Sequence, residues 1–332
     1  MHLYLLTILF ALFFFLDSSM SVCARPKSIK ERMEQRRGER HREKKLEVTK
    51  QELPASLPPY KTWIAPGRRP VACLLCIHGL GLHAGSFEFL GSKASRRGIA
   101  VYAMDVRGFG EWMNAGGKTQ VDFDHCLADV KAMLIAIRSN NPNTQVFVLG
   151  ESMGGAIALR AASLFPELID GLISSVPAEE RFQQKKTSAK VAMNILRPRR
   201  KFDIGSDIVD QATTSESLKQ EWKGDPLDRL DLTSKELIQF QMFMNDNHNS
   251  AAHITRLPVL IVQGTKDKLV KPEGTWELFN ELATEDKVFL AVPGEHLIFE
   301  EAQLQNQMLR EQNMKLVSTW VLSKLLQNRG GQ

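Results

Sequence analysis

The sequence predicts an α/β fold in which helices cover both faces of a mostly parallel sheet. Six short apolar runs, each ending at or beside a glycine or proline, alternate with longer amphipathic segments. Strands buried on both faces are apolar throughout rather than alternately polar, so these runs are typical of a parallel sheet. The predicted strands are residues 71–79, 99–108, 145–151, 169–177, 258–264 and 287–294.

The segments around these strands complete the predicted architecture. A weaker run, KTWIA at 61–65, is predicted to be an antiparallel edge strand. The alternation breaks over about 178–255, where helix-like pieces occur without a comparable strand, so we expect a helical cap inserted between two strands of the sheet. The predicted helices outside this cap are residues 121–139, 153–165, 273–283 and 299–326.

The N-terminal end of the chain differs from the rest. Leu3 to Leu16 is an almost unbroken apolar run, shorter than the ~20 residues of a membrane-spanning helix and suited to a signal peptide. We therefore expect residues 1–24 to be a signal peptide, with an uncleaved membrane anchor as the alternative, and an extracytoplasmic protein, secreted or periplasmic. Residues 25–55 are expected to form a basic charged linker, helical or disordered, before a folded domain at 56–332.

The excess of positive charge is confined to one short segment. Residues 25–50 hold 11 Lys or Arg and 5 Glu, whereas the whole chain has a formal net charge of +5. Residues 51–332 contain equal numbers of basic and acidic side chains, so this part should not attract polyanions and no nucleic-acid partner is expected. The basic segment leaves open a peripheral contact with an anionic membrane surface.

The cysteines indicate neither a disulfide framework nor a metal site. Three would remain after loss of the first 24 residues, which is an odd number. Cys73 and Cys76 lie within the apolar run VACLLCIHG and, three residues apart on a strand, should point to opposite faces. We expect buried side chains rather than a redox pair, and no second cluster suggests zinc, so neither a metal nor a cofactor is predicted.

One serine stands where strand character changes to helix character. VFVLGESMGGAIALR, residues 146–160, runs from apolar residues into G-E-S-M-G at 150–154 and continues as Ala-rich sequence. The pattern G-x-S-x-G in this context predicts a sharp turn that needs small neighbours because it packs tightly. The turn places Ser152 at the carboxyl end of a strand, where open α/β sheets bind ligands. Ser152 is therefore the predicted nucleophile.

A serine hydroxyl needs a base and an orienting acid to become a good nucleophile. When the serine lies on such a turn, the acid and then the histidine follow it in the chain. Asp267 and His296 each come shortly after a predicted strand, so both should lie at the carboxyl edge of the sheet. We predict His296 as the base and Asp267 as the acid, with Glu295 and Asp286 as alternative acids.

Backbone N–H groups are predicted to bind the oxyanion. IHGLGLH, residues 77–83, follows the first strong strand with a His-Gly turn. The N–H groups of Leu80 and Met153 could be directed at one carbonyl oxygen. His78 is then expected to hold the loop rather than to take part in catalysis.

Taken together, these residues resemble the α/β-hydrolase superfamily and, within it, the monoacylglycerol lipase and lysophospholipase group, also described as serine-aminopeptidase-like hydrolases. The resemblance covers about 60–325. It implies the α/β-hydrolase fold, a catalytic role for the predicted serine, histidine and aspartate, and a cap at 178–255 over an acyl pocket. The motifs that carry it are His78-Gly79, Asp105-x-Arg107-Gly108-x-Gly110, Gly150-x-Ser152-Met153-Gly154-Gly155, Asp267, His296 and GDPLD at 224–228.

The resemblance predicts a serine hydrolase that cleaves carboxylic esters through an acyl-enzyme, with small esters, monoacylglycerols or lysophospholipid-like molecules as substrates. Apolar cap residues would suit an acyl chain, but cap helices equally need apolar faces to pack against the rest of the domain. A small-peptide aminopeptidase of the same fold is one alternative, and it would use acidic residues such as Glu179 and Glu180 to hold an amine. A ligand-binding protein without activity is the other, which the complete set of three side chains disfavours. The cap residues considered for the acyl chain are Met193, Leu196, Met242 and Met244.

Overall fold

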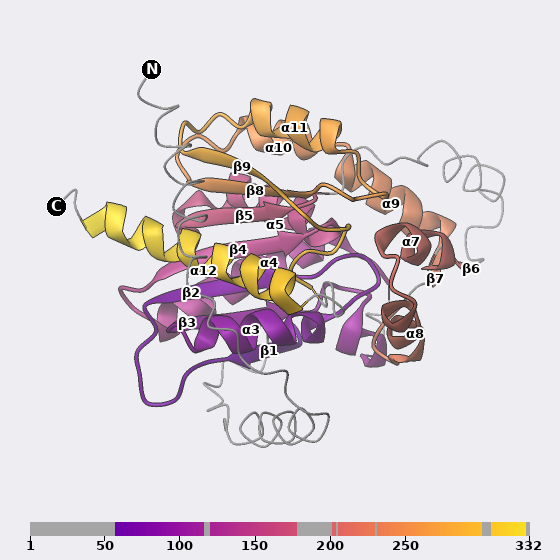
Figure 1. Cartoon of the computed structure of the whole chain (residues 1–332), viewed down its shortest axis with the longest axis horizontal. Helices are drawn as coiled ribbons and strands as arrows, with labels where there is room; N and C mark the ends of the chain where they lie inside the picture. The colour runs from indigo at the N-terminus through magenta and orange to yellow at the C-terminus, as the bar shows by residue number, and fades with distance from the viewer. Residues whose placement is uncertain are drawn as a thin grey trace, which may run out of the picture. The chain divides into compact units, whose positions relative to one another are not determined.

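A seven-stranded sheet forms the centre of the folded domain. The computed structural model describes residues 57–115, 120–177, 201–203, 205–229, 231–300 and 307–329. The strand order in the main sheet is β1-β3-β2-β4-β5-β8-β9 (Figure 1). Its strands are β1 (Tyr60–Trp63), β2 (Ala72–Ile77), β3 (Ile99–Met104), β4 (Gln145–Glu151), β5 (Gly171–Ser175), β8 (Val259–Gly264) and β9 (Lys287–Val292).

The strands of the main sheet are parallel except for β1, which pairs antiparallel with β3. The predictions of a mostly parallel sheet and of an antiparallel edge strand near 61–65 are therefore confirmed. Parallel strands have their carboxyl ends at the same edge of a sheet, so the loops that follow β2, β4, β8 and β9 meet there.

Helices cover both faces of the sheet, as predicted. In Figure 1, α3 and α12 lie in front of the sheet, and α4, α5 and α11 contribute to the core on its other face. The described helices are α3 (Glu88–Ser95), α4 (Phe123–Asn140), α5 (Met153–Leu164), α7 (Gly205–Ala212), α8 (Glu216–Gly224), α9 (Ser234–Met244), α10 (Asn247–Ala252), α11 (Pro272–Glu281) and α12 (Gln307–Arg329), with the short 3-10 helices η1 (Ala84–Phe87), η2 (Gly110–Asn114) and η3 (Pro166–Leu168).

The side chains of β4 show why its sequence is apolar throughout. Val146 and Val148 belong to the core that includes α4 and α5, whereas Phe147 and Leu149 belong to the core that includes α3 and α12. All four are buried. Each side chain of this kind contributes about 1.5–3 kcal/mol on burial, and both faces of the strand are used.

Cys73 and Cys76 divide between the two faces in the same way, as their spacing predicted. Both are buried and free. Burial raises the pKa of Cys73 to about 12 and raises that of Cys76 well above its ordinary value. Neither thiol ionises near neutral pH, which agrees with a packing role rather than a redox role.

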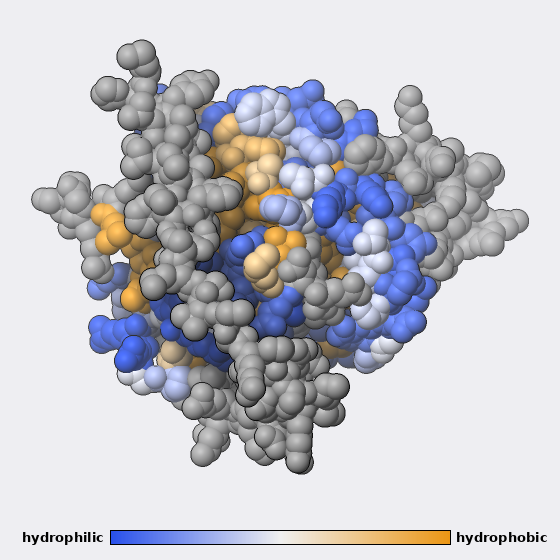
Figure 2. All heavy atoms as spheres, in the orientation of Figure 1, coloured by the Kyte–Doolittle hydropathy of each residue, from blue (hydrophilic) through white to orange (hydrophobic). Residues whose placement is uncertain are grey.

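The edge strand β9 is only partly covered. Val288 is 42% exposed, and Trp276 of α11 packs against Phe279 and Phe289 nearby. Figure 2 shows hydrophobic side chains at the surface in this region, whereas the surface over α7 and α8 is largely hydrophilic. On this face of the molecule, exposed apolar surface therefore lies at the edge of the sheet rather than on these two helices.

The chain between β5 and β8 forms the predicted helical insertion. Its described part contains α7, α8, α9 and α10, together with a small antiparallel sheet of β6 (Lys201–Asp203) and β7 (Asp231–Thr233). The two short strands were not predicted, because three-residue strands leave no recognisable pattern. Residues 178–200 of the insertion lie outside the described residues.

The first two residues of the helix predicted at 299–326 are not helical. Phe299 and Glu300 lie in the loop after β9, and the described part of α12 is Gln307–Arg329. The N–H groups of both loop residues donate to the carboxylate of Glu151. This acceptor is distant in sequence, so the amphipathic pattern of the segment could not reveal it.

The predicted leader at 1–24 and linker at 25–55 lie outside the described residues. None of the described helices has both the length and the apolar character that crossing a membrane requires.

Replacing Phe147 with Ala should lower the free energy of unfolding by about 3–5 kcal/mol, the usual cost of a large-to-small change in a core. Phe147 is fully buried and its ring meets that of Trp320 on α12, with ring centroids 5.9 Å apart. Guanidinium denaturation would measure the change. The control is Leu164→Ala at a 52% exposed position, which should cost within about 0.5 kcal/mol. Equal losses in the two variants would contradict this view of the core.

Candidate active site

Four loops at the carboxyl edge of the sheet carry the residues selected from the sequence. Leu80 follows β2, Ser152 follows β4, Asp267 follows β8 and His296 follows β9. These residues are far apart in the chain and come together because the strands they follow are parallel.

Ser152 stands on a strained turn between β4 and α5. Its φ of 55° and ψ of −116° lie outside the regions that non-glycine residues normally adopt. Two glycines permit the close backbone packing around it. A Cβ on Gly150 would lie 1.9 Å from the Gly154 carbonyl oxygen, and a Cβ on Gly154 would lie 1.9 Å from that of Ile77. The N–H of Ser152 also donates to the Ser175 carbonyl at 2.9 Å, so the turn is fixed on both sides.

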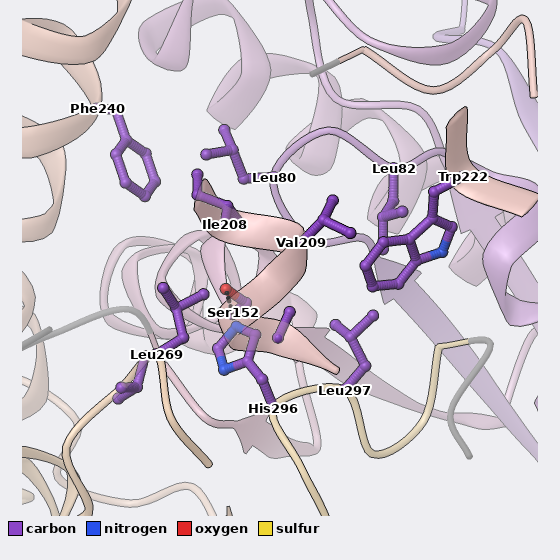
Figure 3. A pocket seen from close by; sticks show the side chains of 13 residues that line it. Leu80, Leu82, Ser152, Ile208, Val209, Trp222, Phe240, Leu269, His296 and Leu297 are labelled. Carbon is purple, nitrogen blue, oxygen red and sulfur yellow. Dashed lines mark hydrogen bonds between the residues drawn. The ribbon is translucent and has the colours of Figure 1, made fainter. Parts of the chain in front are cut away.

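The side chains of Ser152, His296 and Asp267 form one hydrogen-bonded line. Ser152 Oγ lies 2.8 Å from His296 Nε2, as drawn in Figure 3, and His296 Nδ1 lies 2.8 Å from Asp267 Oδ2. All three residues are buried. With Asp267 ionised, Nδ1 carries the imidazole proton and Nε2 can accept the hydroxyl proton. The structure thus brings together the three side chains that the sequence analysis selected.

The Asp267 carboxylate is held by its own loop. The N–H groups of Leu269 and Val270 donate to Oδ1 at 2.8 and 3.0 Å. Burial on its own would raise the pKa of Asp267, but the charge of His296, its hydrogen bond and the two N–H groups together lower it below its ordinary value. Asp267 is therefore ionised at neutral pH.

The imidazole of His296 is made more basic by its surroundings. Burial disfavours the charged imidazolium, yet the charge of Asp267 and the hydrogen bond to it raise the pKa of His296 above its ordinary value, and the carboxylate of Glu151 acts in the same direction. A raised pKa suits a group that must accept a proton from a hydroxyl.

The two alternative acids lie elsewhere. The Glu295 carboxylate is turned toward the cap, where it accepts hydrogen bonds from the hydroxyl of Thr213 at 2.8 Å and the N–H of Thr214 at 3.0 Å. Asp286 precedes β9, so it lies at the opposite edge of the sheet, 2.6 Å from the ammonium of Lys324. Neither carboxylate is hydrogen-bonded to the imidazole of His296.

His78 holds the loop after β2, as expected. Its Nε2 accepts a hydrogen bond from the N–H of Val106 at 2.9 Å, and its Nδ1 lies 2.8 Å from the carbonyl oxygen of Gly79. Burial lowers the pKa of His78 to about 4, so the ring is neutral with its proton on Nδ1. Leu80 comes directly after this turn. Met153 is the first residue of α5, and the N–H groups of a first helical turn have no intrahelical acceptor.

An apolar pocket opens onto Ser152 and His296 (Figure 3). Its walls come from the loop after β2, from α7, α8 and α9 of the cap, and from the loops after β8 and β9. The apolar side chains that line it are Leu80, Leu82, Ile208, Val209, Ala212, Trp222, Phe240, Leu269, Val270 and Leu297.

The cap is tied to both loops that flank the pocket. On one side, His83 Nε2 lies 3.2 Å from Asp225 Oδ2, within the GDPLD stretch noted in the sequence. On the other side, the N–H of His296 donates to the carbonyl oxygen of Ala212 at 3.3 Å, at the end of α7. The cap helices that form part of the pocket wall are therefore hydrogen-bonded to the loop after β2 and to the loop that carries His296.

Met242 and Met244 do not line the pocket, which favours the packing alternative for these two cap residues. Met242 is 68% exposed, and Met244 is buried in the main core rather than in the pocket. Met193 and Leu196 lie outside the described residues, as do Glu179 and Glu180. Sequence reasoning missed the cap residues that do line the pocket, because an apolar helix face for packing and one for a ligand have the same pattern.

The side chains of Ser152, His296 and Asp267 are hydrogen-bonded in sequence and do not surround a shared position that a metal ion could occupy. Over the described ranges, no group of three or more His, Cys, Asp or Glu side chains is arranged to hold a metal ion.

The fold and the hydrogen-bonded serine define the class as α/β-hydrolase. A family model described as serine aminopeptidase, S33, matches residues 68–303. The chain belongs to this family, and its similarity to monoacylglycerol and monoglyceride lipases makes it an enzyme of the carboxylic ester hydrolase class.

Known relatives share most of the folded domain. A Schizosaccharomyces pombe protein, provisionally named as a monoglyceride lipase, is 27% identical over 250 residues, which are 70% of this chain and 64% of that protein. The monoacylglycerol lipase of Mycolicibacterium smegmatis is 25% identical over 280 residues, 80% of this chain and 93% of its own length. The crystal structure of a soluble variant of Saccharomyces cerevisiae monoglyceride lipase, in complex with a substrate analog, matches with a TM-score of 0.69 and 21% identity over 82% of this chain and 97% of that chain.

Replacing Asp267 with Asn should lower the pKa of His296. The substitution removes the charge that raises this pKa and leaves the burial that opposes protonation. NMR titration of the imidazole would then show the ring staying neutral to a lower pH than in the unchanged protein. Asp286→Asn is the control, because that carboxylate lies at the opposite edge of the sheet, and it should leave the titration where it is. An unchanged or higher pKa in Asp267→Asn would contradict the electrostatic account.

Proposed function

We propose that this enzyme hydrolyses monoacylglycerols or similar monoacyl esters, with Ser152 as nucleophile, His296 as general base and Asp267 as the orienting acid. The observation that carries the proposal is the buried line of hydrogen bonds from Ser152 through His296 to Asp267 at the floor of an apolar pocket. The ester group of a substrate would lie at Ser152, and its single acyl chain would contact the apolar walls of the pocket.

The reaction proceeds in two steps. His296 Nε2 takes the hydroxyl proton as Ser152 Oγ attacks the ester carbonyl, and the imidazolium then gives this proton to the departing alcohol. An acyl-enzyme remains. In the second step His296 takes a proton from water, which attacks the acyl carbonyl, and the acid leaves as the proton returns to Ser152.

Charge develops on the carbonyl oxygen in both steps. We assign its stabilisation to the N–H groups of Leu80 and Met153, with the positive end of α5 acting in the same direction. Asp267 stabilises the imidazolium that forms at the same time, and its low pKa keeps it ionised throughout.

The choice of a monoacyl ester rests on the pocket and the relatives. The pocket walls that the structure describes are formed mainly by aliphatic and aromatic side chains, with no carboxylate among the lining residues. An aminopeptidase needs a carboxylate to hold the substrate's ammonium group, so these walls favour an acyl chain over an amine. The named relatives support the same substrate class.

Ser152→Ala should abolish labelling by a fluorophosphonate probe and reduce hydrolysis of p-nitrophenyl esters and monoacylglycerols by at least about 10³-fold, because the acyl-enzyme forms on the hydroxyl that this change removes. Ser86→Ala is the control: Ser86 is buried in η1 but is not part of the hydrogen-bonded line. Labelling and activity that survive in Ser152→Ala would refute the assignment. A substrate panel that includes aminoacyl p-nitroanilides distinguishes esterase from aminopeptidase activity.

Val209→Phe should narrow the pocket and shift preference toward short acyl chains. Val209 is 1% exposed and lies on α7 in the pocket wall. We expect kcat/KM for a decanoyl ester to fall about tenfold or more relative to acetate, the scale of hydrophobic discrimination in pockets. Val288→Phe, at an exposed position on β9, is the matched control. A parallel fall for all chain lengths would argue against an acyl site at α7.

A further inference from the structure

Glu151, the residue directly before Ser152, is a fully buried carboxylate that the proposed mechanism does not use. It is the last residue of β4 and is 0% exposed. A buried carboxylate is costly unless hydrogen bonds satisfy it, so its partners show what it does in the fold.

Four groups donate hydrogen bonds to this carboxylate. They are the hydroxyl of Ser175 at 2.7 Å and the N–H groups of Ile298 at 2.9 Å, Phe299 at 3.0 Å and Glu300 at 2.8 Å. An ionised carboxylate has about four acceptor positions and no donor, so this set matches the anion. Burial raises the pKa of Glu151, and these hydrogen bonds oppose that effect.

The three N–H groups belong to the loop that carries His296. Ile298 is two residues beyond the histidine, so anchoring this backbone fixes the point from which the imidazole reaches Ser152. The connection continues through Glu300, whose Oε1 accepts the N–H of Gly79 at 2.7 Å. Gly79 immediately precedes Leu80, a proposed oxyanion donor.

We propose that Glu151 is a positioning residue for hydrolysis: its carboxylate holds the loop of His296 and, through Glu300, the oxyanion loop in register with the nucleophile. This inference rests on the proposed function. A glutamine would fill the same space, but its NH₂ group is a donor and would face N–H groups that also need an acceptor. The negative charge has a second effect, because it favours the imidazolium that forms when His296 takes the proton.

The test is Glu151→Gln, assayed with a p-nitrophenyl ester across pH. We expect kcat to fall on the order of 10–100-fold because the imidazole is misplaced, with a smaller change in KM. The acid limb of the kcat/KM profile should move to lower pH, because loss of the charge lowers the pKa of His296. Glu151→Asp keeps the charge on a shorter side chain, so it should lower kcat and leave the acid limb close to that of the unchanged enzyme.

The control is Asp170→Asn at the other end of β4. This carboxylate also accepts a backbone N–H, that of Val146 at 2.7 Å, and pairs with Arg138 at 2.6 Å. Asp170→Asn should lower thermal stability and leave both kcat and the acid limb of the kcat/KM profile unchanged.

The outcomes separate the two proposals. Rates are normalised to folded protein by near-ultraviolet circular dichroism. A Glu151→Gln enzyme with unchanged kcat, or one with an unmoved acid limb, overturns the positioning role. If that variant does not fold, Glu151→Asp decides, and an unchanged kcat there overturns the role. Activity that persists in Ser152→Ala instead overturns the proposed function itself.

Discussion

The close approach of backbone segments behind Ser152 is the constraint on which the rest of the site depends. The first turn of α5 packs tightly against the end of β2. A side chain at position 154 would collide with the carbonyl oxygen of Ile77, so only glycine fits there. This packing holds Ser152 at a positive φ and directs its hydroxyl at His296. The orientation of the hydroxyl is therefore set by the centre of the sheet, which is rigid, rather than by a surface loop.

Buried charge at the site is stabilised mainly by backbone N–H groups. Asp267 is hydrogen-bonded by the N–H groups of the loop after β8, and Glu151 by those of the loop after β9. Each carboxylate thus orders the loop that supplies its donors, and both raise the pKa of the imidazole between them. Fixed dipoles of this kind need no rearrangement when charge develops in a reaction.

The described part of the cap forms walls of the pocket, whereas Ser152, His296 and Asp267 all lie outside the cap. Its helices α7, α8 and α9 supply half of the apolar residues around the pocket, and they are attached to the loops on either side of Ser152. Changes in the cap can therefore alter which acyl group fits while the hydrogen-bonded line stays in place.

The strand–helix alternation by itself determined the parallel sheet and the helical insertion, because burial on both faces leaves a strong local pattern, and a weaker run indicated the antiparallel edge near 61–65. The G-E-S-M-G turn indicated Ser152, and the positions of His296 and Asp267 after predicted strands made them its candidate partners, since residues that follow parallel strands meet at one edge. Only the tertiary structure decided between Asp267 and the other acids, placed Phe299 and Glu300 in a loop rather than in a helix, and showed which cap side chains face the pocket. Each of these depends on contacts between segments distant in the chain, such as Glu151 with the loop at 298–300, and a local pattern carries no record of them.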